Sequence, residues 1–469
     1  MNNLKMLAGI IGLLVLSLIA AQCGGSAPDA ARSEPAVETG PPLSTEAGGE
    51  TLTTAAEPVV VEKEVEAIVE GEFREAAPAE APAPIAHATP APTMALADRD
   101  ASTEEAAPRL AADQQYQPLR AGEVDDNQLW DDYLLYRLHY EGPYIHDLDV
   151  SERYVIDVRD RAGQPVLDAR VTVFAGDLQG EPVFTGRTYA TGQTLFHPQA
   201  MAAPDVDRFT VWVEKDGGGQ TFVLERHAQE TWPVTLDVPA PDSSINLDVL
   251  FLIDATGSMA DEIAKIQDSI FDVAARIDAL PTRPDVRYGL VTYRDRGDAY
   301  VTRATDFTPD VTAFHQSLLT VVADGGGDYP ESLNEGLHEA LTKPEWRGQD
   351  TVKLVFLVAD APPHLDYAQD YDYAQEMIAA ARRGIKIFSI ASSGLDDQGE
   401  YIFRQLAQFT QGRFIFLTYA DDSNGGLPGD VTTHHVDEED YSVENLDDLL
   451  VKLVTEELAY QDRQLAQQQ

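Results

Sequence analysis

The second half of the chain, from residue 246 onward, combines two hydrophobic patterns. Runs of mostly apolar residues are typical of buried strands, and they occupy residues 247–253, 286–293, 352–359, 385–391 and 413–417. Apolar residues recur at helical spacing in residues 259–280, 311–322, 331–341, 371–383, 400–409 and 443–458. This alternation predicts an α/β domain over residues 246–460 with a doubly wound, mostly parallel sheet. The functional site of such a sheet lies at the carboxyl ends of its strands, and Asp254 and Asp360 each follow a predicted strand.

Residues 131–240 show a different pattern, in which apolar and polar residues alternate over short segments. The predicted strands are residues 152–160, 165–174, 182–189, 194–198, 208–215, 220–226 and 232–238. Short strands at this spacing indicate a small all-β sandwich. The runs DRAGQPVLDARVTV and TGRTYATGQTLF resemble carboxypeptidase-regulatory-like and bacterial Ig-like modules. That resemblance implies a spacer or adhesion module with no chemistry of its own.

The segment that precedes the sandwich lacks the composition of a folded domain. Residues 24–112 hold 17 acidic and 5 basic residues, and Phe73 is their only aromatic residue. A segment of this kind cannot bury enough apolar surface to offset the entropy lost on ordering. Its prolines and like charges favour an extended backbone. We therefore expect residues 23–112 to be a disordered acidic tether rich in Ala, Pro and Glu.

The N-terminus has the pattern of an export signal. Lys5 precedes an apolar run over residues 6–21, which is short for a membrane span, and Cys23 follows directly. Residues 1–22 with Cys23 resemble a bacterial lipoprotein signal, which implies lipidation at Cys23. Gln22 stands where that family has a small residue. An uncleaved anchor and an ordinary signal peptide are the alternatives, and each of the three places the rest of the chain outside the cytoplasm. A lipoprotein of the cell envelope is the prediction.

Charge restricts the partners that this chain can bind. The sequence carries 33 basic and 80 acidic residues, a formal net charge of -47. Such a charge repels phosphate backbones and anionic headgroups, so nucleic acid is excluded as a partner. Membrane contact is therefore expected through the lipid anchor.

Oxygen ligands for a metal ion gather after the first strand of the α/β domain. The segment Asp254-Ala-Thr256-Gly-Ser258 matches the DxSxS element of the von Willebrand factor A family, with Thr256 in place of the first serine. Two hydroxyls and nearby carboxylates supply part of the oxygen shell that a hard cation such as Mg²⁺ requires. The resemblance implies a metal-ion-dependent adhesion site (MIDAS) that holds Mg²⁺ or Mn²⁺, with Asp360 as a further ligand. It also implies an open position that a carboxylate of a protein ligand fills. Thr256 and Ser258 could alternatively cap the following helix.

A second loop resembles the integrin β-subunit version of this site. In Gly325-Gly-Gly-Asp328-Tyr-Pro-Glu331, the glutamate after Asp-x-Pro matches a ligand of the main ion. The likeness also implies flanking Ca²⁺ sites, one at Asp261 and Glu262 and one at Asp295 and Asp328.

Each flanking residue also has a structural interpretation. Asp261 and Glu262 would favour the first turn of a helix through its dipole. Asp295 could pair with a neighbouring arginine. His364 is expected to be a hydrogen-bonding loop residue, since an all-oxygen Mg²⁺ site has little use for imidazole. We give the tripeptide Arg296-Gly297-Asp298 no role, because short tripeptides occur by chance.

These features predict an envelope lipoprotein that binds a protein ligand or mediates adhesion through a divalent cation, and that is not an enzyme. One alternative is a non-adhesive scaffold of an envelope complex. Another is a metal-assisted hydrolase, but the chain carries no HExxH, GxSxG or P-loop motif.

Overall fold

The structure is a computed structural model of the chain. It describes residues 119–201, 203–239, 245–418, 435 and 443–462. The predicted signal at residues 1–22, the lipidation site Cys23 and the tether at residues 23–112 lie outside these residues. Among the helices that are described, none has the length and apolar character that a membrane span requires.

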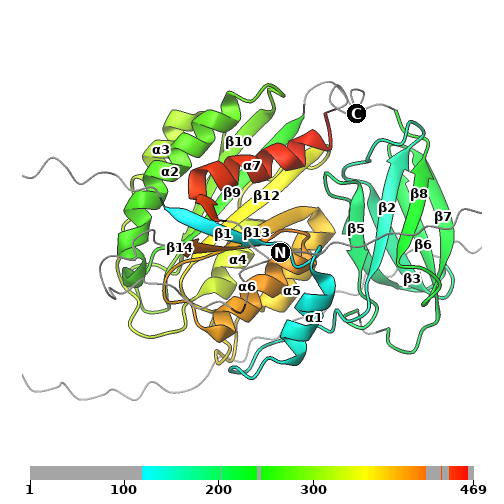
Figure 1. Ribbon diagram of the computed structural model, residues 1–469, viewed down its shortest axis with the longest axis horizontal. Helices are drawn as coiled ribbons and strands as arrows, with labels where there is room; N and C mark the ends of the chain where they lie inside the picture. Colours follow the sequence, from blue (N-terminus) through cyan, green and yellow to red (C-terminus); the bar gives the residue numbers. More distant parts are fainter. Residues whose placement is uncertain (1–118, 202, 240–244, 419–434, 436–442, 463–469) are drawn as a thin grey trace, which may run out of the picture. The chain divides into compact units, whose positions relative to one another are not determined.

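The larger part of the described chain is built on one eight-stranded sheet, with the strand order β11-β10-β9-β12-β13-β14-β1-β15 (Figure 1). The inner strands run parallel to one another: β9 (Asn246–Asp254), β10 (Asp285–Tyr293), β12 (Thr351–Ala359), β13 (Ile385–Ala391) and β14 (Phe414–Thr418). Antiparallel strands flank them: β11 (Thr302–Thr308) on one side, and β1 (Arg120–Val124) with β15 (Val443–Asn445) on the other. The sheet is therefore mostly parallel, as the sequence predicts.

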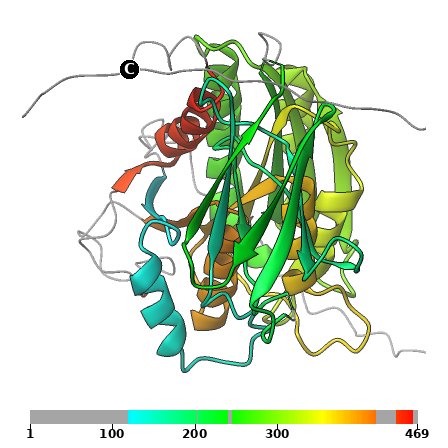
Figure 2. The ribbon, with the colours of Figure 1, turned by 90° about the vertical axis from the view of Figure 1, so that its right-hand side faces the viewer.

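Helices cover both faces of this sheet (Figures 1 and 2). One apolar core contains side chains of α2 (Ala260–Asp278), α3 (Val311–Leu318) and α7 (Leu446–Ala459). The opposite core contains side chains of α1 (Trp130–Leu138), α4 (Leu333–Thr342), α5 (Tyr373–Arg383) and α6 (Asp397–Phe409). The fully buried strand β12 contributes alternate residues to each core. Two covered faces explain why most residues of these strands are apolar, and the doubly wound α/β prediction is confirmed. We call residues 119–150 and 245–462 the α/β domain.

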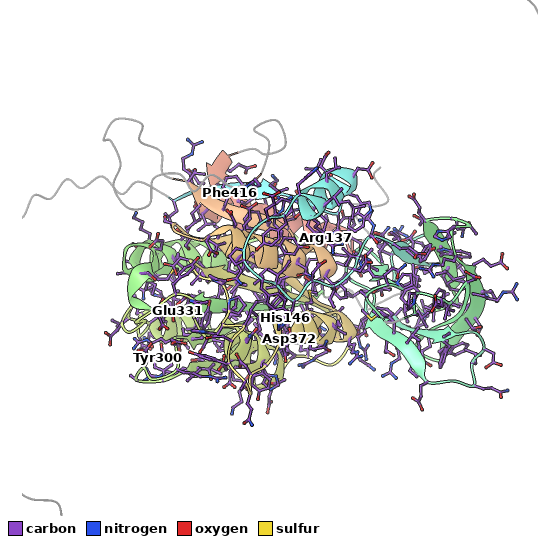
Figure 3. The ribbon with its side chains drawn as sticks, turned by 90° about the horizontal axis from the view of Figure 1, so that it is seen from below. Arg137, His146, Tyr300, Glu331, Asp372 and Phe416 are labelled. Atoms are coloured by element: carbon purple, nitrogen blue, oxygen red, sulfur yellow. The ribbon has the colours of Figure 1, made fainter. Side chains whose placement is uncertain are left out.

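The predicted start of the sandwich at residue 131 is wrong. Strand β1 pairs with β14, and Tyr133 of α1 is buried in the core beneath α5 and α6. Gly122 on β1 lies opposite Phe416, and a Cβ atom at Gly122 would lie only 2.3 Å from the Phe416 ring. The segment after α1 is also held by this domain, since the ring Nδ1 of His146 lies 3.1 Å from the Asp372 carboxylate (both labelled in Figure 3).

The β-sandwich occupies residues 154–236. Its first sheet has the order β5-β2-β8, from β2 (Tyr154–Asp160), β5 (Gln193–Phe196) and β8 (Thr231–Leu236). Its second has the order β4-β3-β6-β7, from β3 (Arg170–Ala175), β4 (Pro182–Arg187), β6 (Arg208–Lys215) and β7 (Gly218–Glu225). Alternate residues of both sheets, such as Val158 and Val173, share one core. The strand predicted over residues 165–174 begins only at Arg170, and the other predicted strands are present within two residues at each end.

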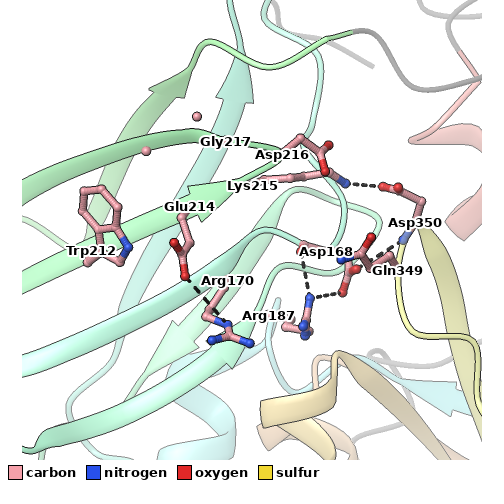
Figure 4. A pocket seen from close by; sticks show the side chains of 12 residues that line it. Asp168, Arg170, Arg187, Trp212, Glu214, Lys215, Asp216, Gly217, Gln349 and Asp350 are labelled. Carbon is pink, nitrogen blue, oxygen red and sulfur yellow. Dashed lines mark hydrogen bonds and ion pairs between the residues drawn. The ribbon is translucent and has the colours of Figure 1, made fainter.

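A pocket of about 360 Å³ lies where the sandwich meets the α/β domain (Figure 4). Several of its charged groups are paired, for example Lys215 with Asp350 and Arg187 with Asp168, the latter at 2.9 Å. Asp350 immediately precedes β12, whereas Asp360 follows it. The sandwich therefore contacts the end of β12 opposite to the predicted metal loops.

Candidate metal centre

The order of strands brings the predicted metal loops together. Strand β9 lies between β10 and β12, and the chain moves outward from β9 in one direction through β10 and from β12 in the other through β13. The boundary between β9 and β12 is thus the point at which the winding reverses, where the loops at the carboxyl ends separate. Asp254 ends β9 and Asp360 directly follows β12, so both carboxylates face this opening.

The first loop holds its side chains in a fixed arrangement. Asp254 is fully buried, and its Oδ1 accepts hydrogen bonds from Thr256 N at 2.9 Å and from Thr256 Oγ1 at 2.7 Å. The Thr256 hydroxyl has therefore used its one proton, and lone pairs of its oxygen remain. Ser258 Oγ lies 3.3 Å from Thr256 Oγ1, and Ser258 is exposed. These side chains therefore present oxygen atoms along one open side.

Backbone hydrogen bonds tie the second loop to the first and the third. Gly257 N donates to Gly325 O at 3.0 Å. Glu331, labelled in Figure 3, donates from its N to Pro362 O at 3.1 Å. The Glu331 carboxylate is 3 % exposed and turns toward Thr256, since a Cβ atom at Gly326 would lie 2.7 Å from Glu331 Oε1 and 3.0 Å from Thr256 Cβ. The structure thus brings Asp254, Thr256 and Glu331 together.

Asp360 joins this group from the third loop. Burial raises its pKa to about 6, with a further increase from the charge of Glu262, while the Ser258 hydroxyl lowers it. The buried Glu262 therefore lies close enough to the main site for its charge to raise the pKa of Asp360. The backbone of Asp261 belongs to the first turn of α2, and its side chain lies outside the described part of the structure.

The donor set fits a hard divalent cation. Asp254 Oδ2, Glu331 Oε2 and Asp360 Oδ1 are buried and lack a hydrogen-bond partner among the described residues. Burial and mutual repulsion raise the pKa of Asp254 to about 7 and that of Glu331 to about 9. Buried carboxylate oxygens without partners are costly, and a cation offsets both their lost hydration and their repulsion. All the donors are oxygens, which Mg²⁺, Mn²⁺ and Ca²⁺ prefer.

A second group of potential ligands lies beside the first. One ligand atom each of Asp295, Asp328 and His364 lies within 4.8 Å of the others. Asp295 and His364 are buried, whereas Asp328 is exposed. The structure therefore brings the predicted pair Asp295 and Asp328 together and adds a histidine.

The sequence alone predicts His364 as a hydrogen-bonding loop residue and indicates no role for Asp298. Asp298 Oδ2 accepts from Asp295 N at 3.2 Å and from Gly326 N at 2.9 Å, so the aspartate of the RGD tripeptide supports both metal loops. Arg296 of the same tripeptide pairs with Glu335 at 2.6 Å and with Asp370 at 2.8 Å. The position of His364 four residues after Asp360 was visible in the sequence, but its contact with Asp295 depends on how distant loops pack.

Comparison with known families agrees with this geometry. Residues 248–419 match the model of the von Willebrand factor A domain, and this range contains the three predicted metal loops and the strand ends that precede them. This part of the chain is a von Willebrand factor A domain. The fold predicted from the Asp254 and Glu331 loops is confirmed, and the α/β domain is called the A domain below.

Two curated proteins share part of this sequence. The alpha-protein kinase vwkA of Dictyostelium discoideum is 29% identical over 193 residues, which is 41% of this chain and 30% of the kinase. An ariadne-like RING finger protein of Acanthamoeba polyphaga mimivirus is 26% identical over 139 residues, which is 29% of this chain and 13% of that protein. The chain therefore spans less than a third of the length of these relatives.

Two solved structures of proximal thread matrix protein 1 from the mussel byssus are also similar. One, with a zinc-occupied MIDAS motif, is 17% identical with a TM-score of 0.29, covering 37% of this chain and 42% of that one. The other is 15% identical with a TM-score of 0.31, covering 47% of each chain.

We expect the substitution Gly326→Ala to weaken cation binding by the A domain about tenfold. Gly326 has φ +69, and a Cβ atom there would meet Glu331 Oε1 and Thr256. Left-handed backbone costs a non-glycine residue roughly 1–2 kcal/mol, and the contact displaces a ligand carboxylate. Calorimetric titration with Mn²⁺ measures the effect. Gly327→Ala is the matched control, since nothing lies within 4 Å of a Cβ at Gly327, and equal affinities for the two variants would contradict the prediction.

Proposed function

We propose that the A domain binds a divalent cation, Mg²⁺ or Mn²⁺, and uses it to hold a carboxylate of a protein partner. Asp254, Thr256, Ser258, Glu331 and Asp360 would hold the ion. The bound cation would supply a positive centre with a position open to an oxygen ligand. The observation that carries the proposal is the set of buried carboxylate oxygens without hydrogen-bond partners on Asp254, Glu331 and Asp360.

The surface around this site supports binding of a macromolecule. The donors are buried on one side and open on the other, where Ser258, Gly326 and Gly327 are exposed. Tyr329, in the second metal loop, is 45 % exposed, and its hydroxyl accepts a hydrogen bond from Asp396 N at 2.9 Å. A half-exposed tyrosine whose hydroxyl is fixed by a hydrogen bond, beside a charged site, is typical of residues that contribute to protein interfaces. Tyr329 would thus contribute to specificity for the partner.

The remaining features of the chain agree with a binding protein outside the cytoplasm. Lipidation at Cys23 would anchor the chain to a membrane of the cell envelope. The acidic tether would keep the A domain close to that membrane, which raises its effective concentration for partners on the same surface. Adhesion to another cell and docking within one envelope both fit this arrangement. The proposed role is binding and not catalysis, and the bound cation would act as an anchor for a ligand.

Displacement of water from bound Mn²⁺ by carboxylate tests this proposal. The full chain is loaded with Mn²⁺, and the relaxation rate of water protons is measured as a short peptide is added. A peptide with one central aspartate is expected to lower the relaxation enhancement, because its carboxylate replaces water on the ion. The same peptide with asparagine is the matched control. Equal effects of the two peptides, or no effect of either, would overturn carboxylate capture at this site.

A further inference from the structure

The cluster of Asp295, Asp328 and His364 differs chemically from the main site, because it contains an imidazole. His364 is 3 % exposed, and its Nε2 atom has no hydrogen-bond partner among the described residues. Nε2 points toward Asp295, whose Oδ1 lies 3.5 Å away. This distance between the buried nitrogen and the carboxylate oxygen is too long for a good hydrogen bond. The arrangement therefore leaves Nε2 available to a ligand placed between them.

The surroundings of His364 select the form of the ring that binds metals. Its Nδ1 lies 2.8 Å from Asp366 Oδ1. An ionised carboxylate only accepts hydrogen bonds, so Nδ1 carries a proton. With the proton on Nδ1, Nε2 is the ring nitrogen whose lone pair would bind a metal ion, and a carboxylate that orients the far nitrogen is the usual partner of a metal-bound histidine. A metal ion between Nε2 and Asp295 Oδ1 would offset the repulsion between this lone pair and the carboxylate.

The position of the ring and of Asp295 is set by several contacts. The His364 ring stacks on Tyr367 with centroids 4.0 Å apart and an interplanar angle of 15°. The Tyr367 hydroxyl donates to Asp295 Oδ1 at 3.2 Å, and Ser332 Oγ donates to the same atom at 3.0 Å. The backbone N of His364 donates to Glu331 O at 3.1 Å. Two of the donors are thus held in place before any ion arrives, which favours binding.

We propose that Asp295, Asp328 and His364 form a second metal site that takes Zn²⁺ or a chemically similar transition-metal ion. Imidazole with carboxylates suits such ions, whereas Ca²⁺ prefers a shell of oxygens. Two donors each about 2.0 Å from a tetrahedral ion lie about 3.3 Å apart, close to the observed separation of Nε2 and Asp295 Oδ1. Asp328 is exposed, so the fourth position faces solvent. The sequence had led us to expect Ca²⁺ at Asp295 and Asp328, and His364 changes that expectation.

This site does not depend on the proposed cation site at Asp254. Its three ligands share no side chain with that site, although Asp295 is close enough to Glu331 to raise the pKa of Glu331. An ion at His364 would lower this repulsion and keep the second and third loops together. The two sites are therefore distinguishable by single substitutions.

Cobalt substitution in the full chain tests the proposal. Mg²⁺ is added first in excess to fill the Asp254 site, and Co²⁺ is then titrated while its visible absorption is recorded. One Co²⁺ with the intense bands of four-coordinate geometry is expected, and one equivalent of Zn²⁺ is expected to displace it, whereas Ca²⁺ is not. His364→Gln is expected to abolish these bands, and Asp328→Asn to weaken Co²⁺ binding at least tenfold. Since Asp328 is exposed, its substitution leaves the fold intact.

Two controls make the outcome unambiguous. His338→Gln removes another histidine that is paired with a carboxylate, at 3.0 Å from Glu376, and is expected to leave the Co²⁺ bands unchanged. Asp254→Asn is expected to lose Mg²⁺ binding and keep the Co²⁺ bands, which separates the failure of one site from that of the other. Bands that persist in both His364→Gln and Asp328→Asn would overturn the proposal. A Zn²⁺-saturated wild-type chain whose His364 ring carries protons on both nitrogens by NMR would overturn it as well.

Discussion

Asp254→Asn is expected to weaken Mg²⁺ or Mn²⁺ binding at the main site by at least a hundredfold while the chain remains folded. The amide keeps the shape of the carboxylate and can still accept the hydrogen bonds from Thr256 N and Oγ1. It removes a negative charge from a fully buried ligand position at the end of β9. Hard cations bind neutral amide oxygens less strongly than carboxylates. Calorimetric titration with Mn²⁺ measures the loss, and capture of the aspartate peptide should disappear with it.

Asp285→Asn is the matched control for this substitution. Asp285 lies at the first position of the neighbouring strand β10, and its exposed carboxylate pairs with Arg347 at 2.9 Å. The change is the same, but it lies at the opposite end of the sheet, so cation affinity should stay within about twofold of the wild type. A similar loss of cation affinity in both variants would show that the overall negative charge of the protein, and not the site at Asp254, binds the ion.

Asp254→Asn should also alter how the free energy of unfolding depends on pH when no cation is bound. The pKa of Asp254, Asp360 and Glu331 is raised to about 7, about 6 and about 9 in the folded chain. The folded state thus binds more protons than the unfolded state, and this stabilisation is complete near pH 4 and lost as pH rises through these values. Each group contributes up to about 1.4 kcal/mol per pH unit.

Urea unfolding in a chelator between pH 5 and pH 8 measures this effect. The wild type should lose stability over that range, and Asp254→Asn should lose less, because one of the groups that take up protons is gone. Saturating Mg²⁺ should also flatten the profile of the wild type, since the ion replaces the protons. Identical slopes for both proteins in the chelator would contradict the assignment of Asp254.

Asp248→Ala is expected to destabilise the chain by about 3–5 kcal/mol, the range for breaking a buried ion pair from one side. Asp248 is fully buried on β9. Its carboxylate accepts from Arg287 at 2.9 and 2.7 Å, and from Arg347 through both its backbone N at 2.9 Å and its side chain at 3.0 Å. Removal leaves two guanidinium groups short of their shared partner. The midpoint of urea unfolding measures the change.

Asp272→Asn provides the comparison for Asp248→Ala. Asp272 lies on α2 with its side chain 56% exposed and pairs with Arg276 at 3.3 Å. A pair of that kind contributes less than about 1 kcal/mol. Cation affinity should be unchanged in both variants while they are folded, since Asp248 lies near the start of β9 and Asp254 at its end. A destabilisation of Asp248→Ala below about 1 kcal/mol would contradict the prediction.

Short segments of the sequence determine many of the strands, helices and strand ends of this protein. Strands β9, β12 and β13 are mostly apolar because both faces of the sheet are covered, and Asp254 and Asp360 stand out because each follows such a run. Helix α5 ends at Gly384, which adopts the left-handed conformation at φ 64. Hydrophobic period and terminal residues report burial and local backbone, so they predicted most elements and the strand ends at Asp254 and Asp360, whereas the resemblance to the A-domain family implied the other ligands of the main site.

Only the tertiary structure decided which distant segments meet. Strand β1 joins the sheet beside β14 although the short run Arg120–Val124 carries no clear pattern, and the edge strand β11 is largely exposed. The contact of His364 with Asp295 and the shared role of Asp248 for Arg287 and Arg347 depend on the order of strands and on loop packing. Periodicity reports whether a residue is buried but not which partner it is buried against. For that reason the sequence predicted oxygen ligands for a cation, and the fold added a histidine beside them.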